Sequence, residues 1–249
     1  MEVHHHPDLR KKNFKEYIFE GLMIFMAVTL GFFAERLREN LAEHMKEREF
    51  VASMIEDAQT DIATIQKTIT KNKMRVLKLE TLSSNCFQFN DAGSSEVYLY
   101  NVIRDCIRHP DFVCPVERTM IQLKNAGGMR LIQKKLAVDS LVFYDDVTKK
   151  LVNQQEYYER QLNVLLDATE EIFNLKCFPL DSPAMKWKAS PDSLLSAKLI
   201  SHDKMKLIEY GNKAKIFQGI VMFYIVRMEE TKLHAINLIC TLKKEYHLK

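Results

Sequence analysis

Glycine and proline are scarce in this chain of 249 residues, which has 7 glycines and 6 prolines. Average usage in soluble domains would give roughly twice as many of each. Both residues interrupt helices, so their scarcity, together with many Leu, Lys, Glu, Gln and Met residues, favours long helices. No stretch alternates apolar and polar residues over the length of a strand. The sequence therefore predicts an all-α fold.

The motifs of common catalytic classes are also missing. The chain has no glycine-rich phosphate loop, no nucleophile elbow and no HExxH zinc motif. The adjacent carboxylates Asp145 and Asp146 would point in different directions on a helix, so we interpret them as part of a solvated face. His4, His5 and His6 are interpreted as a polar tail, with a metal site or a tag remnant as alternatives. We expect a protein that is not an enzyme and has no cofactor.

Charge of one sign is nowhere concentrated. The formal net charge is +3, and acidic and basic residues are interleaved along the chain. A nucleic-acid-binding protein carries its basic residues on one face or stripe. We therefore expect no nucleic-acid partner.

Cysteine is present in an odd number, and no two cysteines have the CxxC spacing of a zinc site. Cys86, Cys106 and Cys114 are close enough in sequence for one disulfide in an oxidising compartment. The alternative is that they are small buried apolar residues. A metal cluster of these residues with His109 fits no common ligand spacing. The five cysteines are Cys86, Cys106, Cys114, Cys177 and Cys240.

One apolar run stands near the start of the chain. From Tyr17 to Ala34 the 18 residues would form a helix of about 27 Å, close to the thickness of a bilayer's hydrocarbon core. Basic residues flank both sides and can reach the two interfaces. The sequence after the run is a poor signal-peptide cleavage site. We predict a transmembrane helix over residues 17–35, a tail over residues 1–16 and a helical domain over residues 36–249.

The orientation rests on weaker signals. Lys and Arg number four in residues 1–16 and four in residues 35–50, so the positive-inside rule gives a tie. Three lysines lie close before the run, and the large domain follows it. We therefore predict a cytoplasmic N-terminus and a periplasmic C-terminal domain, in a bacterial inner membrane.

A glutamate, Glu20, interrupts the apolar run. Its position shares one helix face with mostly small residues, and small residues let transmembrane helices approach closely. A carboxyl group inside a membrane is costly and indicates a functional role. The alternative is that Glu20 lies near the interface, one turn from Glu16, and reaches water. The predicted helix–helix interface consists of Glu20, Ile24, Ala27, Gly31 and Ala34.

Helical periodicity continues after the apolar run without an interruption by glycine or proline until Gly93. Apolar residues recur at spacings of three and four, which predicts one rod of about 60 residues and about 90 Å. Such a long seam needs partners, which are sister copies, later helices of the same chain, or both. The seam consists of Val51, Ile55, Ala58, Ile62, Ile65 and Ile69.

The remainder of the chain predicts further helices of a bundle. Two short helices are expected, one ending near Arg108 and one from Val116 to Asn125. Two long helices are expected at residues 129–174 and 202–246. Within the last one, the almost wholly apolar residues 216–226 are interpreted as the most buried part of the bundle, with a helix abutting the membrane as the alternative.

Two stretches carry a resemblance. "HHPDL…KKNFKEYIFEGLMIFMAVTLGFFAERLRENLAEHMKEREF" and "RTMIQLKNAGGMRLIQKK" resemble uncharacterised single-pass inner-membrane proteins of the Bacteroidota. The resemblance implies a helical extracytoplasmic domain and a recurring glutamate at the position of Glu20, and it supplies no activity. The second stretch is interpreted as a tight helix–turn–helix corner with Arg130 at the start of the next helix. Its residues to note are Gln122, Leu123, Gly127, Arg130 and Leu131.

Together these observations predict a non-enzymatic membrane protein that contacts lipid and either self-associates or serves as a scaffold subunit of a larger envelope complex. A first alternative is an ion-coupled or transport-associated subunit that uses Glu20. A second is a sensor whose outer bundle binds a ligand.

Overall fold

The structure is a computed structural model that describes residues 14–89, 96–107, 110–125, 127–177, 180–181, 186–187 and 198–248. The chain divides into two compact units, Met1–Phe50 and Val51–Lys249. The predicted tail with His4, His5 and His6 lies almost wholly outside the described residues, as does His109.

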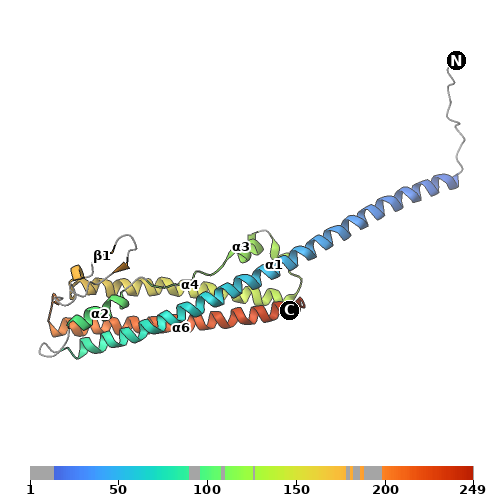
Figure 1. The fold of residues 1–249 in the computed structure, drawn as a ribbon. Helices are drawn as coiled ribbons and strands as arrows, with labels where there is room; N and C mark the ends of the chain where they lie inside the picture. The colour runs from blue at the N-terminus through green and yellow to red at the C-terminus, as the bar shows by residue number, and fades with distance from the viewer. Residues whose placement is uncertain are drawn as a thin grey trace, which may run out of the picture. The chain divides into compact units, whose positions relative to one another are not determined.

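Helix α1 runs without interruption from Phe14 to Phe87, a length of 74 residues, and is drawn in blue to green in Figure 1. Its length follows from the absence of proline and from glycines that lie only in its first part. The predicted continuous rod is confirmed, and it is longer than the expected 60 residues. Its residues up to Phe50 belong to the first unit and those from Val51 to the second.

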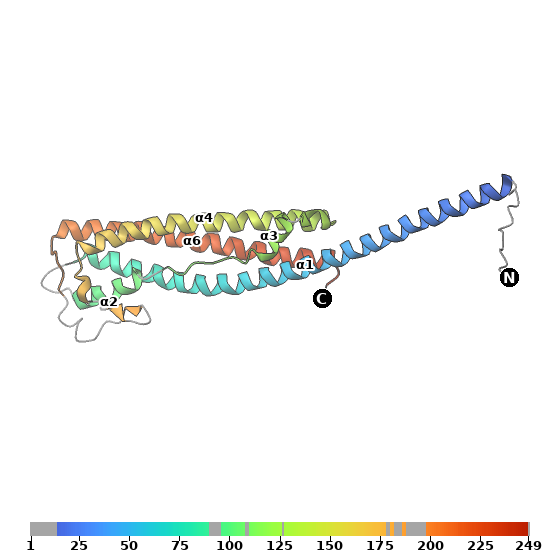
Figure 2. The same ribbon diagram turned by 90° about the horizontal axis from the view of Figure 1, so that it is seen from above.

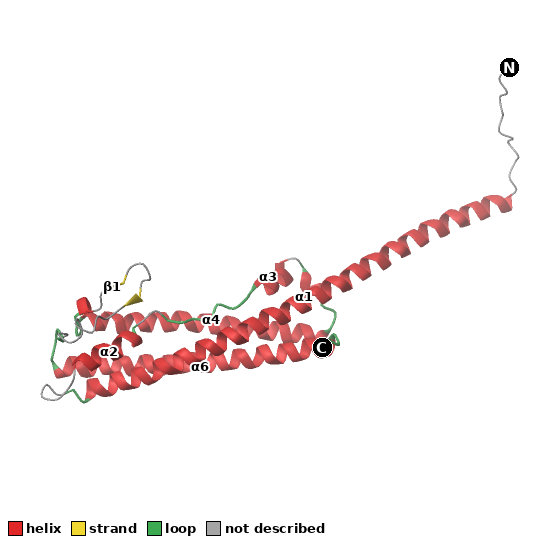
Figure 3. Ribbon diagram, viewed as in Figure 1, coloured by secondary structure: helices red, strands yellow, loops and turns green. Residues whose placement is uncertain are grey.

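The remaining elements belong to the second unit, and Figure 3 shows that helices dominate the described chain, so the predicted all-α fold is confirmed. The two strands are two residues long each and pair antiparallel, with Leu180 opposite Trp187. The elements are α2 (Glu96–Cys106), α3 (Arg118–Asn125), the 3₁₀ turn η1 (Gly128–Leu131), α4 (Lys135–Glu170), the 3₁₀ turn η2 (Leu175–Cys177), β1 (Leu180–Asp181), β2 (Lys186–Trp187) and α6 (Lys204–Glu245).

In the second unit α4, α6 and the later part of α1 lie side by side along their length (Figures 1 and 2). Aromatic side chains fill the space between them. The Tyr158 ring of α4 stands edge-on to Phe217 and Tyr224 of α6, with centroid distances of 5.0 and 5.6 Å. Phe112, in the segment before α3, meets the same Tyr158 ring at 5.2 Å. Edge-to-face pairs of this kind add to the stabilisation from burial.

The seam on α1 is buried inside this bundle. Val51, Ile55, Ala58, Ile65 and Ile69 are at most 8% exposed, and Ile62 is half-buried. Ile65 and Ile69 belong to one core cluster with side chains of α4 and α6. Later helices of the same chain therefore cover these seam residues, as one of the possibilities left open by the sequence predicted.

The interpretation of residues 216–226 as the most buried part of the bundle is wrong. Phe217, Val221 and Tyr224 are buried, but Met222 and Val226 are 52% and 59% exposed. Each helix of a three-helix bundle packs one face against the other two helices, and its opposite face stays exposed. An apolar outer face remains on α6.

The structure also answers the question of a disulfide. None of Cys86, Cys106 and Cys114 is in a disulfide bond. Cys86 and Cys106 are fully buried in the core, as small apolar residues would be, and burial raises the pKa of the Cys86 thiol to about 12. Cys114 is exposed.

Candidate functional site

The first candidate site is the predicted interface on α1. Glu20, Ile24, Ala27, Gly31 and Ala34 are all exposed. A Cβ atom added at Gly31 would meet nothing within 4 Å. Within the described residues, α1 is the one helix long and apolar enough to cross a membrane, and its apolar window is 0% buried. The large side chains around the face are exposed as well, for example Phe25 and Phe32 at 68% and 73%. This segment is an apolar surface that the protein's own bundle core does not use.

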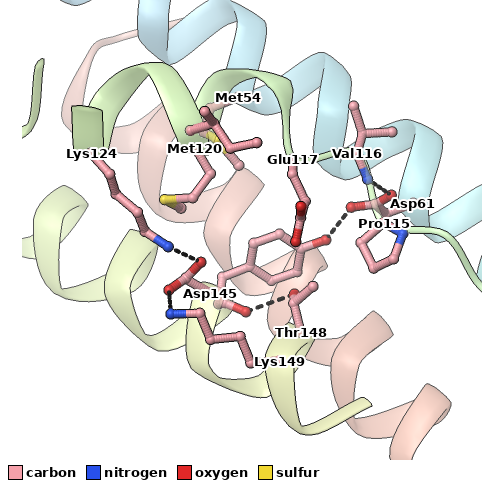
Figure 4. Close-up of a pocket in the computed structure, with 12 residues that line it drawn as sticks. Met54, Asp61, Pro115, Val116, Glu117, Met120, Lys124, Asp145, Thr148 and Lys149 are labelled. Carbon is pink, nitrogen blue, oxygen red and sulfur yellow. Dashed lines mark hydrogen bonds and ion pairs between the residues drawn. The ribbon is translucent and has the colours of Figure 1, made fainter. Parts of the chain in front are cut away.

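The second candidate site is a polar cluster inside the bundle, centred on two carboxylates of α1, Asp57 and Asp61. The side chains of residues four apart lie on the same helix face. Asp61 accepts a hydrogen bond of 2.6 Å from the Tyr144 hydroxyl of α4 and one of 2.9 Å from the Val116 amide (Figure 4). These bonds link α1, α4 and the segment that precedes α3.

Asp57 accepts hydrogen bonds from the first residues of α3. Its carboxylate accepts hydrogen bonds from the Thr119 amide at 3.1 Å and from the Thr119 hydroxyl. The Arg118 guanidinium donates to it at 2.6 Å. The first amides of a helix have no partner within the helix, so a buried carboxylate from a neighbouring helix can serve as their cap. Asp57 thus fastens α3 to α1.

A cavity of about 180 Å³ lies beside Asp61 and Tyr144. Figure 4 shows its wall, where Lys124 and Lys149 both reach Asp145, with the Lys149 pair at 2.8 Å. Burial raises the pKa of the Asp61 carboxyl, against the hydrogen bonds from Tyr144 and Val116, which favour the ionised form. Burial and the nearby Asp61 also raise the pKa of the Tyr144 hydroxyl. Its neutral O–H therefore stays a donor to Asp61.

The cluster's chemistry is that of a structural clamp. Among the described residues, no buried side-chain nitrogen or oxygen lacks a hydrogen-bond partner. A binding or catalytic site in an empty cavity normally leaves polar groups aimed at the missing ligand. Here Asp61, Tyr144 and Asp145 are already bonded to protein groups. Within the part of the chain that is described, no three His, Cys, Asp or Glu side chains are grouped so that they could hold a metal ion.

Sequence reasoning missed this cluster. Asp57 and Asp61 lie directly beside the seam residues Ala58 and Ile62, at a spacing of four. The same spacing is also typical of two exposed carboxylates at the edge of a solvated helix face. The signal that separates the two cases is the partner segment around Arg118, and its position depends on the tertiary fold.

A second polar cluster joins the later part of α1 to α4. Arg75 donates a hydrogen bond to the Tyr158 hydroxyl, which in turn donates to the Asn72 side-chain oxygen at 3.2 Å. Asn72 also donates to the backbone oxygen of Asp111 at 3.3 Å. All of Asn72, Arg75 and Tyr158 are buried. Satisfied networks of this kind fix the register of packed helices.

Glu96, the first residue of α2, fastens the segment before α6. Its carboxylate accepts a 2.6 Å hydrogen bond from the Leu199 amide and faces Lys198 and His202 at 3.5 and 3.3 Å. Burial raises the pKa of this carboxyl, but the bonds from Leu199, His202 and Lys198 together hold the pKa below its usual value. These contacts of Glu96 join α2 to the segment before α6 at one end of the bundle.

The corner motif forms a turn, with one correction. α3 ends at Asn125, and Gly127 has a left-handed φ of 65° that suits glycine. Leu123 is buried and Gln122 is exposed. Arg130, exposed, lies in η1 and not at the start of the next helix.

The extended backbone at Ile132 and Lys134 separates η1 from α4, which begins only at Lys135. This break explains why Arg130 is outside the helix. Leu131 is half-buried. A Cβ atom at Gly128 would lie 3.0 Å from the Leu123 Cα, so the second glycine permits the close return of the chain. The motif's role in the structure is that of a tight turn.

Comparison of the chain with protein-family models, with curated proteins and with solved structures finds no match in any of the three.

The carboxylate of Asp57 offers a direct test of the clamp. We expect Asp57→Ala to lower the free energy of unfolding of the bundle by about 2–4 kcal/mol, because the buried amide and hydroxyl of Thr119 lose their acceptor and Arg118 loses its ion pair. The matched control is Glu56→Ala, whose side chain is 72% exposed and 4.0 Å from Arg118. Its loss should cost less than about 0.5 kcal/mol. Denaturant titration of the full chain in mild detergent, followed by circular dichroism, measures both. Equal losses in the two variants would contradict the clamp.

Proposed function

We propose that the protein is a non-enzymatic, single-pass membrane protein that acts as a structural subunit of an assembly. In this proposal residues 17–35 span a bacterial inner membrane, with residues 1–16 in the cytoplasm and residues 36–249 in the periplasm. The observation that carries the proposal is the full exposure of the apolar segment of α1. An apolar surface of this length is stable only against lipid or other helices.

The face of Glu20, Ala27 and Gly31 is the proposed contact with another helix, from a sister copy or from a different subunit. Small residues let two backbones come close, and packing and hydrogen bonds then hold transmembrane helices together. Gly31 is open in the isolated chain, as it must be for a partner to approach. The bundle's polar clusters, which are bonded internally, support a structural role for the outer domain over ligand sensing.

The proposed orientation has a direct test in a native thiol. Cys114 is exposed on the bundle, so a membrane-impermeant maleimide should label it in spheroplasts, where only the periplasmic side of the inner membrane is accessible. A Cys114→Ser variant identifies the signal from this residue. Labelling of Cys114 that appears only after the membrane is permeabilised would place the bundle in the cytoplasm and overturn the orientation.

A large side chain introduced on the face of Glu20, Ala27 and Gly31 tests the helix contact. We expect Gly31→Leu to weaken association by about tenfold or more, since a large side chain prevents close approach of the helices. The matched control is Gly21→Leu, because Gly21 is equally open but lies off the face. Native mass spectrometry of the full chain in mild detergent measures the assembled fraction. A parent chain that stays monomeric and captures no partner from its own membrane would contradict the proposal.

Glu20 distinguishes assembly from ion coupling. Glutamine keeps the hydrogen-bonding capacity of the side chain but cannot bind or release a proton at neutral pH. We therefore expect Glu20→Gln to assemble like the parent and Glu20→Leu to assemble less, by the same mass measurement. A Glu20→Gln complex that assembles normally but loses an ion-dependent activity of the cell membrane would instead favour an ion-coupled subunit.

A further inference from the structure

An apolar groove of about 590 Å³ runs along the surface of the second unit between α1 and α6. Its lining includes Leu77 of α1 and, from α6, Gly219, Met222, Phe223 and Val226. The four larger side chains are 45–61% exposed. A Cβ atom at Gly219 would meet nothing within 4 Å, so the floor of the groove is open there.

The exposure of this groove is unusual because the apolar side chains are contiguous. Single exposed apolar residues are common on soluble proteins, whereas a connected patch marks a surface that another molecule covers. The bundle core has no need of these side chains, since Phe217, Val221 and Tyr224 on the inner face of the same helix are already buried. The groove therefore calls for an occupant outside this chain's own fold.

Charged pairs close the groove at both ends. At one end Lys215 of α6 is paired with Glu80 of α1. At the other end Glu229 of α6 lies 3.9 Å from Lys73 of α1. Lys73, Leu77 and Glu80 follow one face of α1 at spacings of four and three, as the groove requires. Each end thus carries a cation and an anion on different helices, and at the second end Glu229 also pairs with Lys232 of α6 at 2.5 Å.

We propose that the groove is the contact between two copies of this chain, which pack through it about a two-fold axis parallel to the helices. Such an axis places α1 of one copy opposite α6 of the other, because an isologous contact pairs each surface with itself. Lys215 of one copy then faces Glu80 of the other, and Lys73 faces Glu229. At the centre of the groove Met222 of one copy then faces Leu77 of the other.

The direction of the two chains rests on the proposed function, since copies anchored by the same segment in one membrane run the same way. The charge pattern also suits the opposite direction, where Lys215 would face Glu229, so the experiment must separate the two. A lipid surface is the less suitable occupant. It would have to accept the charged side chains at the groove ends, whereas a second copy supplies a further counter-charge to each member of the two ion pairs between α1 and α6.

Cysteine cross-linking of the full chain in mild detergent tests the contact. The exposed native thiols are first removed by Cys114→Ser and Cys240→Ser, and single cysteines are then placed by Leu77→Cys or Met222→Cys. The control is Val142→Cys, on α4, which is 54% exposed and far from the groove in sequence. We expect mixed Leu77→Cys and Met222→Cys chains to form a disulfide with each other at least about tenfold faster than either forms one with the control, because a formed contact raises the effective thiol concentration.

The two positions also report direction. In the proposed direction Leu77 of one copy faces Met222 of the other, whereas in the opposite direction each of the two residues faces its own counterpart. A disulfide requires Cα atoms within about 7 Å, so cross-links that form only when the two kinds of chain are mixed support the proposed direction. Cross-links of each variant with itself would overturn it in favour of opposite directions. Rates equal to that of Val142→Cys would exclude the groove as the contact between copies.

A charge placed in the groove gives an independent measurement. Leu77→Asp should weaken self-association by at least about tenfold, because it places a carboxylate in the apolar centre. Leu136→Asp is the matched control, since Leu77 and Leu136 are 61% and 60% exposed and neither change reaches the core. Equal dimer fractions for the two variants by native mass spectrometry would contradict the proposal.

The groove and the intramembrane face are separated by a combined variant. Leu77→Cys and Met222→Cys are each introduced into the Gly31→Leu chain, and the mixed chains are cross-linked in the same way. Persistent cross-links would show that the groove holds two copies even where the helix contact of the proposed function fails. Vesicle-dependent protection of Met222→Cys from alkylation, without cross-links, would identify lipid as the occupant and overturn the proposal.

Discussion

The uninterrupted hydrogen-bond ladder of α1 is the constraint on which the remaining structure depends. A single helix of 74 residues has to satisfy two patterns of apolar residues. In residues 17–34 apolar side chains surround the helix, as Phe25 and Phe32 show. From Val51 they occupy one side, where α4 and α6 cover them. The backbone is helical through both stretches. The two stretches therefore differ only in the pattern of their side chains.

Buried polar groups then determine how the other elements attach to α1. Asp57 and Asp61 hold the start of α3 and Tyr144, and further along Asn72 and Arg75 hold Tyr158. Apolar packing has little directional preference, so it tolerates shifts of one helix along another. Hydrogen bonds at two levels of α1 do not tolerate such shifts. The bundle's register is therefore specified by these few side chains, while its stability comes mainly from the apolar core.

Sequence reasoning reached the fold class because helical periodicity and a lack of breakers are local signals. The seam from Val51 to Ile69 and the length of α1 followed from the same signals. The outer face of α6 was misjudged, since a wholly apolar stretch such as residues 216–226 carries no period that distinguishes inside from outside. The roles of Asp57 and Asp61 could not be read from their spacing, because their partners Thr119 and Val116 are more than fifty residues away. The start of α4 was placed too early for a related reason, namely that the extended residues before Lys135 are not marked by proline or glycine.

Two reduced thiols lie in the core at Cys86 and Cys106. A thiol reacts with oxidants through its thiolate, and burial keeps Cys86 almost wholly protonated at neutral pH. Oxidation at this site is therefore limited by opening of the bundle and not by the redox potential of the surroundings. The core thus protects its own two cysteines kinetically, so they can remain reduced in an oxidising compartment for as long as the bundle stays folded.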